Sequence, residues 1–301
     1  MKPGWERIRR IVAVAKLKRV KRLIVNADDF GYTGGINRAV LELNQRGIVS
    51  STTLMAVAPA TEDAGGRVNS GCNLGVGCHV VLVDGEPVLP ASQVSTLLDP
   101  ATGRFRSSLE SFVRDLLLGR IRESEIQAEA EAQIAHIQSL GLQLTHLDTH
   151  KHTHMFPAVL RPVLQAARHL EIRGIRNPFE ASWSLGATTG APLLRRLQVR
   201  LIRQYERPFR RMAEAAGLAT TDGAAGVLAT GTLDTATIES LLQAMPDGTW
   251  ELVTHPGYND AQLSGAGTRL TSSRQVELDA LNSLSLGSAI HLIHFGQLTS
   301  S

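Results

Sequence analysis

The sequence predicts an α/β fold in which about seven parallel strands close into a barrel. Runs rich in Val, Ile, Leu and Thr alternate with segments of helical periodicity from residue 22 to the end of the chain. This alternation is typical of parallel strands joined by crossover helices, and this number of strands favours a barrel over an open sheet. The chain has 301 residues, 43% of them hydrophobic, so it can bury a substantial core.

Seven segments have the composition of strands, and they are residues 22–27, 48–57, 73–83, 143–149, 172–176, 250–254 and 289–295. Five segments between them have helical periodicity, and they are residues 35–46, 124–140, 157–170, 235–244 and 272–285. Ser124 and Gln127 have the spacing of a capping box, and Pro157 suits a first helical turn. Residues 84–106 and 177–190 are long polar loops, which usually shape a substrate site.

Two adjacent carboxylates, Asp28 and Asp29, follow the first predicted strand. Neighbouring side chains of a regular strand point to opposite faces, so both acids reach one cavity only if the strand ends here and the chain bends. Phe30 and Gly31 supply the bend. At the carboxyl end of a parallel strand, an Asp pair suits a metal ligand beside a general base. The alternative is that an Asp caps the helix predicted over residues 35–46.

Imidazole groups lie near the carboxyl ends of three further predicted strands. His79 lies in the third strand, and His255 directly follows residues 250–254. The fourth strand and its continuation carry an alternating set, which is His146, Asp148, His150, His152 and His154. Any one of these histidines alone would more often be a core or surface residue. Together with the Asp pair, they suit a metal site built from distant parts of the chain.

The alternating histidines cannot all bind one ion. Residues two apart on a strand are separated by roughly 6.6 Å, whereas a metal–nitrogen bond is about 2.0 to 2.1 Å long. We therefore expect one of these histidines to be a ligand, or two if a bend brings a neighbour to the same ion. The spacing does not choose between His150 and His152. Asp148 is positioned to orient that ligand. His152 and His154 also suit a substrate loop or a structural role.

Basic residues gather in two segments of the chain. Residues 1–22 hold nine basic residues and one acid, so the net charge of +3 leaves about −5 for the rest. Residues 194–211 hold seven arginines interleaved with apolar residues at helical spacing. Such segments can lie on an anionic membrane surface, although solvated faces of ordinary helices have the same pattern. Nucleic acid is disfavoured as a partner, because three Tyr and three Trp provide few stacking platforms.

The two cysteines, Cys72 and Cys78, are too few for a disulfide framework and are not spaced as a redox pair, which fits a reducing compartment. No apolar run approaches the ~18 to 20 residues that cross a bilayer. The apolar stretch at residues 11–15 is too short for a secretory signal and is interrupted by Lys16. We therefore expect a cytoplasmic protein, with peripheral contact at the inner face of the membrane as a further expectation.

Five motifs follow one another in the chain: Asn-Ala-Asp-Asp-Phe-Gly at 26–31, Gly-x-His at 77–79, Thr-His-Leu-Asp-Thr-His-Lys-His-Thr-His at 145–154, Thr-His-Pro-Gly-Tyr at 254–258 and Arg-x-x-Glu-Leu at 274–278. In this order, from about residue 21 to residue 295, the chain resembles the YdjC-type carbohydrate deacetylases. The resemblance implies a distorted β/α barrel, which we expect over residues 21–301, and the charge pattern predicts a basic extension at residues 1–20 before it. The resemblance also implies one divalent ion held by one Asp and two His; two imidazoles and a carboxylate favour Zn²⁺, and the family resemblance also allows Mg²⁺.

Carried over by motif position, the resemblance implies that the metal ligands are Asp29, His79 and His150, with Asp28 as the general base and His255 as the general acid. The implied reaction is hydrolysis of an N-acetyl group on an amino sugar, which gives acetate and a free amine. Either Arg176 or Arg274 could pair with Asp28 and keep it ionised, although an ordinary surface salt bridge is an equal expectation for each.

Within this family, residues 79–90 and 104–106 look most like the branch associated with hopanoid biosynthesis. That branch implies an N-acetylglucosaminyl hopanoid, a membrane glycolipid, as substrate. Chitooligosaccharides and other N-acetylated glycans are the alternative. A glycoside hydrolase and a non-catalytic metal-dependent glycan-binding protein are further alternatives, although adjacent carboxylates are poorly placed to flank a scissile glycosidic bond. The chain departs from the family pattern at Lys151, where histidine is common, and in its long basic N-terminus.

Overall fold

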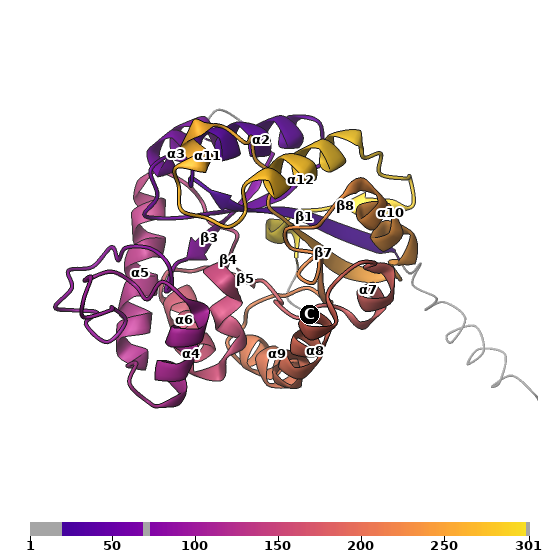
Figure 1. Ribbon diagram of the computed structural model, residues 1–301. Coiled ribbons are helices and arrows are strands. Elements are labelled where there is room, and N and C mark those ends of the chain that lie inside the picture. Colours follow the sequence, from indigo (N-terminus) through magenta and orange to yellow (C-terminus); the bar gives the residue numbers. More distant parts are fainter. Residues whose placement is uncertain (1–19, 69–72, 299–301) are drawn as a thin grey trace, which may run out of the picture.

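The computed structural model describes residues 20–68 and 73–298, and Figure 1 shows its helices arranged around a curled sheet. The sheet consists of β1 (Lys21–Phe30), β2 (Ser51–Leu54), β3 (Gly75–Val80), β4 (His146–Thr149), β5 (Gly174–Ile175), β6 (Gly223–Ala225), β7 (Gly248–Thr254) and β8 (Ile290–Leu292). The α-helices are α2 (Gly34–Gln45), α3 (Thr61–Val68), α4 (Leu109–Leu117), α5 (Glu123–Ser139), α6 (Pro157–His169), α7 (Ser182–Ala187), α8 (Leu193–Ile202), α9 (Glu206–Ala215), α10 (Thr235–Ala244), α11 (Ala261–Ser264) and α12 (Ser272–Ser283). Three short 3₁₀ segments are η1 (His150–Met155), η2 (Arg203–Tyr205) and η3 (Phe295–Gln297).

The strands pair in the order β5-β4-β3-β2-β1-β7-β6, and β8 pairs with the first residues of β1. Every ladder between these named strands is parallel. The two edges of the curled sheet are joined by isolated parallel bridges at Gly174↔Ala219 and Glu180↔Ala224 instead of a continuous ladder. This arrangement confirms the predicted α/β fold with a distorted barrel.

The sequence explains why β1 lies in the interior of this sheet, between β2 and β7. Its residues 23–30 are all buried, and Leu23, Ile24 and Val25 are apolar, as in a parallel strand covered on both faces. Residues two apart share a face of each strand. The pairs Asn26 and Asp28 of β1, and His146 and Asp148 of β4, therefore project together toward the inside of the barrel. The polar site is thus built on alternate positions of buried strands.

Several predicted elements need correction. The strand β6 was not predicted, and residues 177–190 contain the helix α7 within the expected loop. The capping box at Ser124 is wrong, because α5 begins one residue earlier and its N-cap, Arg122, makes no side-chain cap hydrogen bond. Pro157, by contrast, opens α6 as predicted. The loop over residues 84–106 also forms as predicted.

The predicted basic extension falls almost wholly on residues 1–19, which lie outside the described residues, as does Cys72. Cys78 is buried with a free thiol. Among residues 20–68 and 73–298, no helix combines the length and the apolarity that crossing a membrane requires.

Candidate metal and catalytic site

A β-bulge brings Asp28 and Asp29 to the same side of β1. The ladder with β2 is regular as far as Ala27 and resumes at Phe30, where β1 has used one residue more than β2. Asp29 has a φ of 63°, which is in the left-handed region. The prediction that the strand ends before the Asp pair is therefore wrong: the strand continues, and the bulge turns Asp29 toward the cavity that Asp28 already faces.

Three potential ligand atoms come together above the end of the sheet. Nε2 of His79 lies 3.4 Å from Oδ1 of Asp29 and 3.2 Å from Nδ1 of His150. Nδ1 of His150 lies 3.5 Å from Oδ1 of Asp29. Two ligand atoms that are each about 2.0 to 2.1 Å from a tetrahedral ion are roughly 3.3 to 3.4 Å apart. The three donors are therefore spaced to share one divalent cation.

His79 is held in a defined orientation by the neighbouring strand. Its Nδ1 lies 2.6 Å from Oδ1 of Asp148, its register partner on β4, and 3.2 Å from Oγ1 of Thr53. With Nδ1 directed at Asp148, Nε2 faces Asp29 and His150, and in the neutral ring Nε2 carries the lone pair that a cation would use. Burial lowers the pKa of His79, but Asp148 outweighs this and raises it to about 9. Asp148 was expected to orient a ligand of its own strand, and it contacts His79 instead.

The turn after β4 separates His150 from His152. Lys151 and His152 have φ values of 56° and 54°, both in the left-handed region, so the chain leaves the extended path directly after His150. The alternation of faces therefore stops at Thr149. His150 points to Asp29. His152 lines the same cavity but is not part of the ligand group. Its buried Nδ1 has no hydrogen-bond partner among the described residues.

The other two histidines of the motif support the fold. The ring of His146 is fully buried and stacks on Phe295 with a centroid distance of 3.9 Å. His154 is also fully buried, with its Nδ1 2.7 Å from Oγ1 of Thr149 and its Nε2 3.2 Å from the carbonyl oxygen of Arg176. Burial lowers the pKa of His146 to about 3 and that of His154 to about 4. Both rings are neutral, structural groups.

Asp28 is held by a buried arginine. Nη2 of Arg176 donates to Oδ1 of Asp28 at 2.6 Å and Nη1 donates to Oδ2 at 2.8 Å. Asn26 donates a further hydrogen bond to Oδ1 at 2.9 Å. Burial would raise the pKa of Asp28, but the guanidinium outweighs it and holds the pKa below its ordinary value. The expectation of a surface salt bridge is wrong, because Arg176 is 0% exposed.

The same guanidinium also binds Asp148 and Glu251, so three carboxylates surround one arginine. Burial raises the pKa of Glu251 to about 7, although Arg176 opposes this rise. Glu251 was not predicted as a site residue from the sequence. Its signal was an acid within the otherwise apolar end of β7, where a solvated face is not expected.

Arg274 does not pair with Asp28, and pairs with Asp29. Its Nη2 donates to Oδ2 of Asp29 at 2.5 Å, and its Nε donates to the carbonyl oxygen of Leu270 at 3.1 Å. Burial by itself would raise the pKa of Asp29. Arg274 and, to a smaller extent, His150 outweigh this effect, so the pKa of Asp29 lies well below its ordinary range. Each of the two adjacent carboxylates thus has its own arginine.

His255 lies beside Asp28 in the same cavity. Its Nε2 is 3.7 Å from Oδ2 of Asp28, and its Nδ1 is 3.9 Å from Oε2 of Glu277. Glu277 also accepts a hydrogen bond from the backbone N–H of His255 at 2.6 Å. Burial lowers the pKa of His255 to about 4 and raises that of Glu277 to about 7. Glu277 therefore fixes the position of His255 from behind.

These groups line a cavity of about 840 Å³, which we call the catalytic cavity. All five site residues predicted from the sequence line it, namely Asp28, Asp29, His79, His150 and His255. A second cavity, of about 1120 Å³, is called the adjacent cavity and shares Asp84, Ser107 and Gly267 with the first. Lys151 donates to Asp84 at this shared boundary, with a distance of 3.0 Å.

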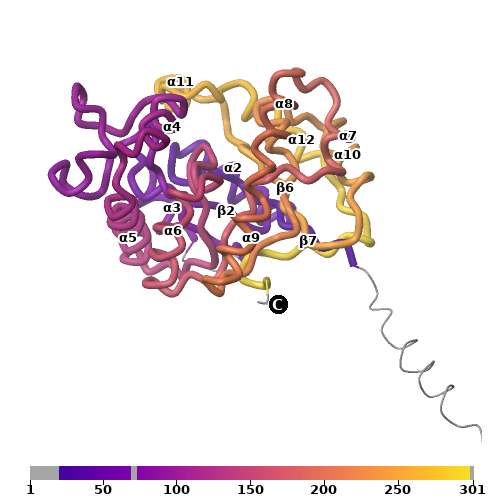
Figure 2. Tube along the Cα trace, turned by 90° about the horizontal axis from the view of Figure 1, so that it is seen from below, coloured from indigo at the N-terminus to yellow at the C-terminus, as the bar shows by residue number. Residues whose placement is uncertain are grey.

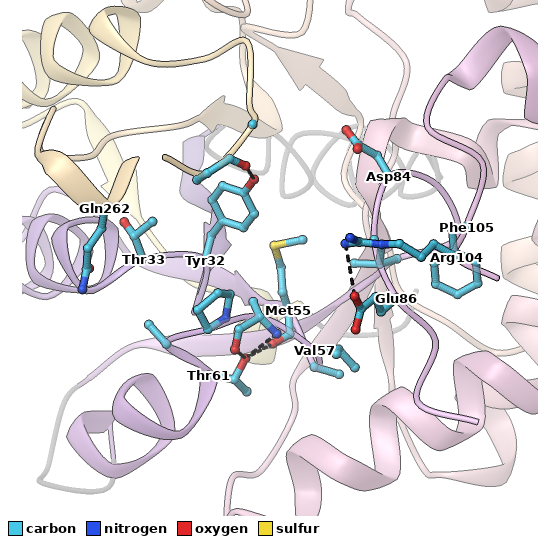
Figure 3. A pocket seen from close by; sticks show the side chains of 18 of the residues that line it. Tyr32, Thr33, Met55, Val57, Thr61, Asp84, Glu86, Arg104, Phe105 and Gln262 are labelled. Atoms are coloured by element: carbon cyan, nitrogen blue, oxygen red, sulfur yellow. Dashed lines mark hydrogen bonds and ion pairs between the residues drawn. The ribbon is translucent and has the colours of Figure 1, made fainter. Parts of the chain in front are cut away.

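Figure 3 shows the adjacent cavity, with Tyr32 and Met55 on one side and Arg104 and Glu86 on the other. Arg104 and Glu86 form an ion pair at 3.3 Å. The lining residues 55–60 read Met-Ala-Val-Ala-Pro-Ala, so one wall is largely apolar. The cavity therefore offers both apolar and charged surface beside the catalytic cavity.

The family model of the YdjC-like proteins matches residues 22–291, which includes all five predicted site residues. The chain belongs to the YdjC-like family. A carbohydrate deacetylase of Brevibacillus brevis is 32% identical over 283 residues, which cover 92% of this chain and 99% of the relative. A carbohydrate deacetylase of Mus musculus is 30% identical over 261 residues, which cover 81% of this chain and 80% of the relative. These findings confirm the predicted hydrolase class.

A solved structure agrees with the YdjC-like fold. A crystal structure of an Enterococcus faecalis protein, named as a candidate cellobiose-phosphate cleavage protein, matches with a TM-score of 0.72 and 25% identity over 92% of this chain and 98% of the other. The YdjC-like barrel of this chain thus brings together the five residues named from its sequence. Four further residues contact this group and were not given these roles from the sequence: Thr53, Asp148, Glu251 and Glu277. Of these, only Asp148 was expected to orient a ligand, and its partner is His79 instead of a residue of its own strand.

Proposed function

We propose that this protein is a carbohydrate N-deacetylase that uses one divalent cation to remove the acetyl group from an N-acetylated amino sugar. The observation that carries the proposal is the convergence of Asp29, His79 and His150 beside Asp28 and His255 in one cavity. The carbohydrate deacetylases among the relatives support the same reaction class.

Asp29, His79 and His150 are the proposed ligands. Two imidazoles and one carboxylate favour Zn²⁺, although Mg²⁺ is the alternative cation. The bound ion would supply Lewis-acid polarisation of the acetyl carbonyl and lower the pKa of a water molecule. A second group of carboxylates and imidazole, which is Asp28, His79 and Asp148, has a similar spacing. We do not assign the ion there, because Arg176 already neutralises both carboxylates of that group.

Asp28 is the proposed general base. Arg176 keeps it ionised, so its carboxylate is available to accept a proton from the attacking water. The bidentate contact also fixes the direction of the carboxylate at the wall of the catalytic cavity.

His255 is the proposed general acid for the departing amine. The ring is neutral at rest, since burial lowers its pKa to about 4. It therefore needs a proton before it can act as an acid, and Oδ2 of Asp28, 3.7 Å from Nε2, is the nearest proposed source. In this scheme, the proton that Asp28 takes from water passes to His255 and then to the sugar nitrogen. Acetate and the free amine are the products.

For the substrate, we propose an N-acetylglucosaminyl hopanoid or a closely related glycolipid. The resemblance of residues 79–90 and 104–106 to the hopanoid-associated branch supports it. The catalytic cavity of about 840 Å³ opens beside an adjacent cavity of about 1120 Å³ with an apolar wall, which suits a substrate with a bulky group next to its sugar. Peripheral contact with an anionic membrane is part of this proposal.

The test of the catalytic assignment is the variant Asp28→Asn. Asparagine keeps the shape of the side chain but cannot accept the proton, so the rate of acetate release should fall by about 10²- to 10⁴-fold, the usual contribution of a general base. The metal content, measured by mass spectrometry of the purified protein, should stay unchanged because Asp28 is not a proposed ligand. The exposed Asp279→Asn is the matched control.

Retention of turnover in Asp28→Asn within tenfold of the wild-type rate would remove Asp28 from the base role. The substrate is tested separately by mass spectrometry, with N-acetylglucosaminyl lipids and chitooligosaccharides offered side by side. Loss of one acetyl group from the lipid in preference to the oligosaccharide supports the proposed substrate. Preference for the oligosaccharide rejects it, and a shortened glycan would indicate a glycoside hydrolase.

A further inference from the structure

The helix α8 (Leu193–Ile202) has an apolar face that the described residues leave uncovered. No residue of α8 is buried. Its exposed leucines, with their exposed fractions, are Leu193 (72%), Leu194 (68%), Leu197 (46%) and Leu201 (68%). This helix alone holds four of the nine large apolar side chains that are exposed among the described residues. Their spacing of one, four and eight residues from the first leucine places them on a single stripe.

The opposite side of α8 forms part of the wall of the catalytic cavity, and its lining residues are Arg195, Gln198, Val199 and Ile202. A helix with its side chains is about 10 to 12 Å thick. Any surface that covers the leucine stripe therefore lies within about one helix diameter of the catalytic cavity. This position distinguishes α8 from an ordinary peripheral helix.

A second apolar pair lies on another helix of the same cavity wall. Leu117 and Leu118, at the end of α4, are 74% and 57% exposed, and the same helix contributes Leu109 and Val113 to the lining of the catalytic cavity. Figure 2 shows α4 and α8 along the same upper edge of the molecule. The exposed apolar side chains thus gather on helices that border one opening.

The charge around α8 selects the kind of partner. Residues 193–211 contain seven arginines and one acid, Glu206. Arg203 and Arg210 pair with that acid, and Arg195 and Arg196 donate to backbone carbonyl groups. The remaining arginines, Arg200, Arg207 and Arg211, are exposed. A second copy of this chain would bring like charges together at such a face, whereas an anionic lipid surface matches both the leucines and the arginines.

We propose that the leucine stripe of α8 and its flanking arginines form the surface that binds an anionic lipid bilayer and presents the catalytic cavity to it. The leucines enter the boundary between head groups and acyl chains, and Arg200 and Arg207 contact the anionic head groups. The biological role of this surface rests on the proposed function, because membrane binding brings the catalytic cavity to a substrate only if the acetylated sugar is attached to a membrane lipid. The binding itself does not depend on the substrate and is measured without it.

The first measurement is partition of the full chain between buffer and vesicles, either of phosphatidylcholine alone or of an equal mixture with phosphatidylglycerol. The wild-type protein should prefer the anionic vesicles. Leu194→Ser combined with Leu201→Ser should lower the partition coefficient about tenfold or more. Arg200→Gln and Arg207→Gln should lower it roughly fivefold each, and only for anionic vesicles. Val276→Ser on α12, a residue that is 48% exposed, is the control, with less than about a twofold change expected.

The second measurement separates α8 from the basic N-terminus, which can also attract anionic vesicles. An environment-sensitive dye is attached to Leu201→Cys in a chain that also carries Cys72→Ser. The proposal predicts a blue shift of the dye on anionic vesicles. Binding of the chain without a blue shift, or the absence of binding, overturns the proposal. A stable dimer that buries the dye in the absence of vesicles, detected by light scattering, also overturns it.

Activity on a water-soluble chitooligosaccharide separates this inference from the proposed function. Leu194→Ser with Leu201→Ser should release acetate from the soluble substrate at the wild-type rate and from the vesicle-bound glycolipid at a rate about tenfold lower. If wild-type protein releases no acetate from either substrate, the proposed function fails, while the vesicle measurements still decide whether α8 binds lipid. Equal loss on both substrates would place the leucines in the fold and contradict a docking role.

Discussion

The adjacent carboxylates of β1 differ because each has a different arginine. Arg176 binds Asp28 through two hydrogen bonds, and Arg274 binds Asp29 through Oδ2, which leaves Oδ1 of Asp29 toward the two imidazoles. Two like charges at neighbouring positions would otherwise repel each other in a buried site. The pairing explains how one acid can be a proposed base and the other a proposed ligand.

The residues that gather at the site could be named from the sequence because the carboxyl ends of parallel strands lie at one edge of a sheet. The residues that contact and orient them could not be named in this way. The contact between Asp148 and His79 depends on the register of β3 against β4. The choice of His150 over His152 depends on left-handed φ angles that the residue types there do not specify.

The fully buried His146 should make stability depend on pH. Burial lowers its pKa in the folded protein from 6.5 to about 3. As the pH falls below 6.5, the unfolded chain takes up the proton first, so the free energy of unfolding decreases until about pH 3. Above pH 6.5 this contribution to stability is fully present. The slope from one such group is at most about 1.4 kcal/mol per pH unit.

Urea unfolding at several pH values below 6.5 checks this prediction. His146→Gln removes the titrating ring, so its free energy of unfolding should fall less steeply with decreasing pH than that of the wild type. The comparison uses the slope, because loss of stacking on Phe295 lowers stability at every pH. His291→Gln, at an exposed position, should keep the wild-type slope. Equal slopes for His146→Gln and the wild type would contradict the account.

At the scale of the elements, two local departures from regular geometry build the site. The bulge in β1 turns Asp29 inward, and the left-handed pair after β4 turns His150 toward it. Bulges and left-handed residues other than glycine are costly and concentrate at functional sites. The sequence indicated the strands and a bend near the Asp pair, but it did not indicate that the bend is a bulge within β1 or that the residues after β4 are left-handed, since Asp, Lys and His also occur in regular structure.

The turn after β4 gives a specific prediction for the backbone. Lys151→Pro forces φ to about −65° at a position where the structure has 56°, so His150 should leave the ligand group and affinity for the divalent ion should fall about tenfold or more. Lys151→Gly also removes the contact with Asp84 but permits a positive φ, so it is the matched control and should keep the affinity within about threefold.

Isothermal titration with Zn²⁺ on metal-free protein checks both variants, and circular dichroism confirms that each is folded. If Lys151→Pro binds as tightly as Lys151→Gly, the left-handed turn has no part in placing His150.

Other elements show where sequence patterns are weak. β6 consists of Gly223, Ala224 and Ala225, which lack the branched and aromatic side chains that indicate a strand. The capping-box pattern at Ser124 was present, yet the helix starts before it. The positions of β1 and β7 were predicted because their apolar runs, residues 23–25 and 252–253, are typical of strands buried on both faces, although β1 continues beyond its predicted end.

At the scale of the whole molecule, the barrel places the proposed chemistry, two cavities and the exposed helix α8 at one end. The alternation of strands and helices predicted the fold class, whereas the order of the strands is known only from the structure. The exposed leucines of α8 were visible in the sequence as part of an amphipathic pattern. That they remain uncovered on the wall of the catalytic cavity depends on packing between distant segments, which the pattern alone does not determine.

The central claim is that Asp29, His79 and His150 share one divalent cation, and titration of metal-free protein with Zn²⁺ tests it most directly. The account predicts one tightly bound ion per chain and an affinity about 100-fold weaker or more in each of Asp29→Ala, His79→Ala and His150→Ala. The exposed His169→Ala should bind as the wild type does. Wild-type affinity in all three variants, or a wild-type protein that binds no ion, would contradict the account.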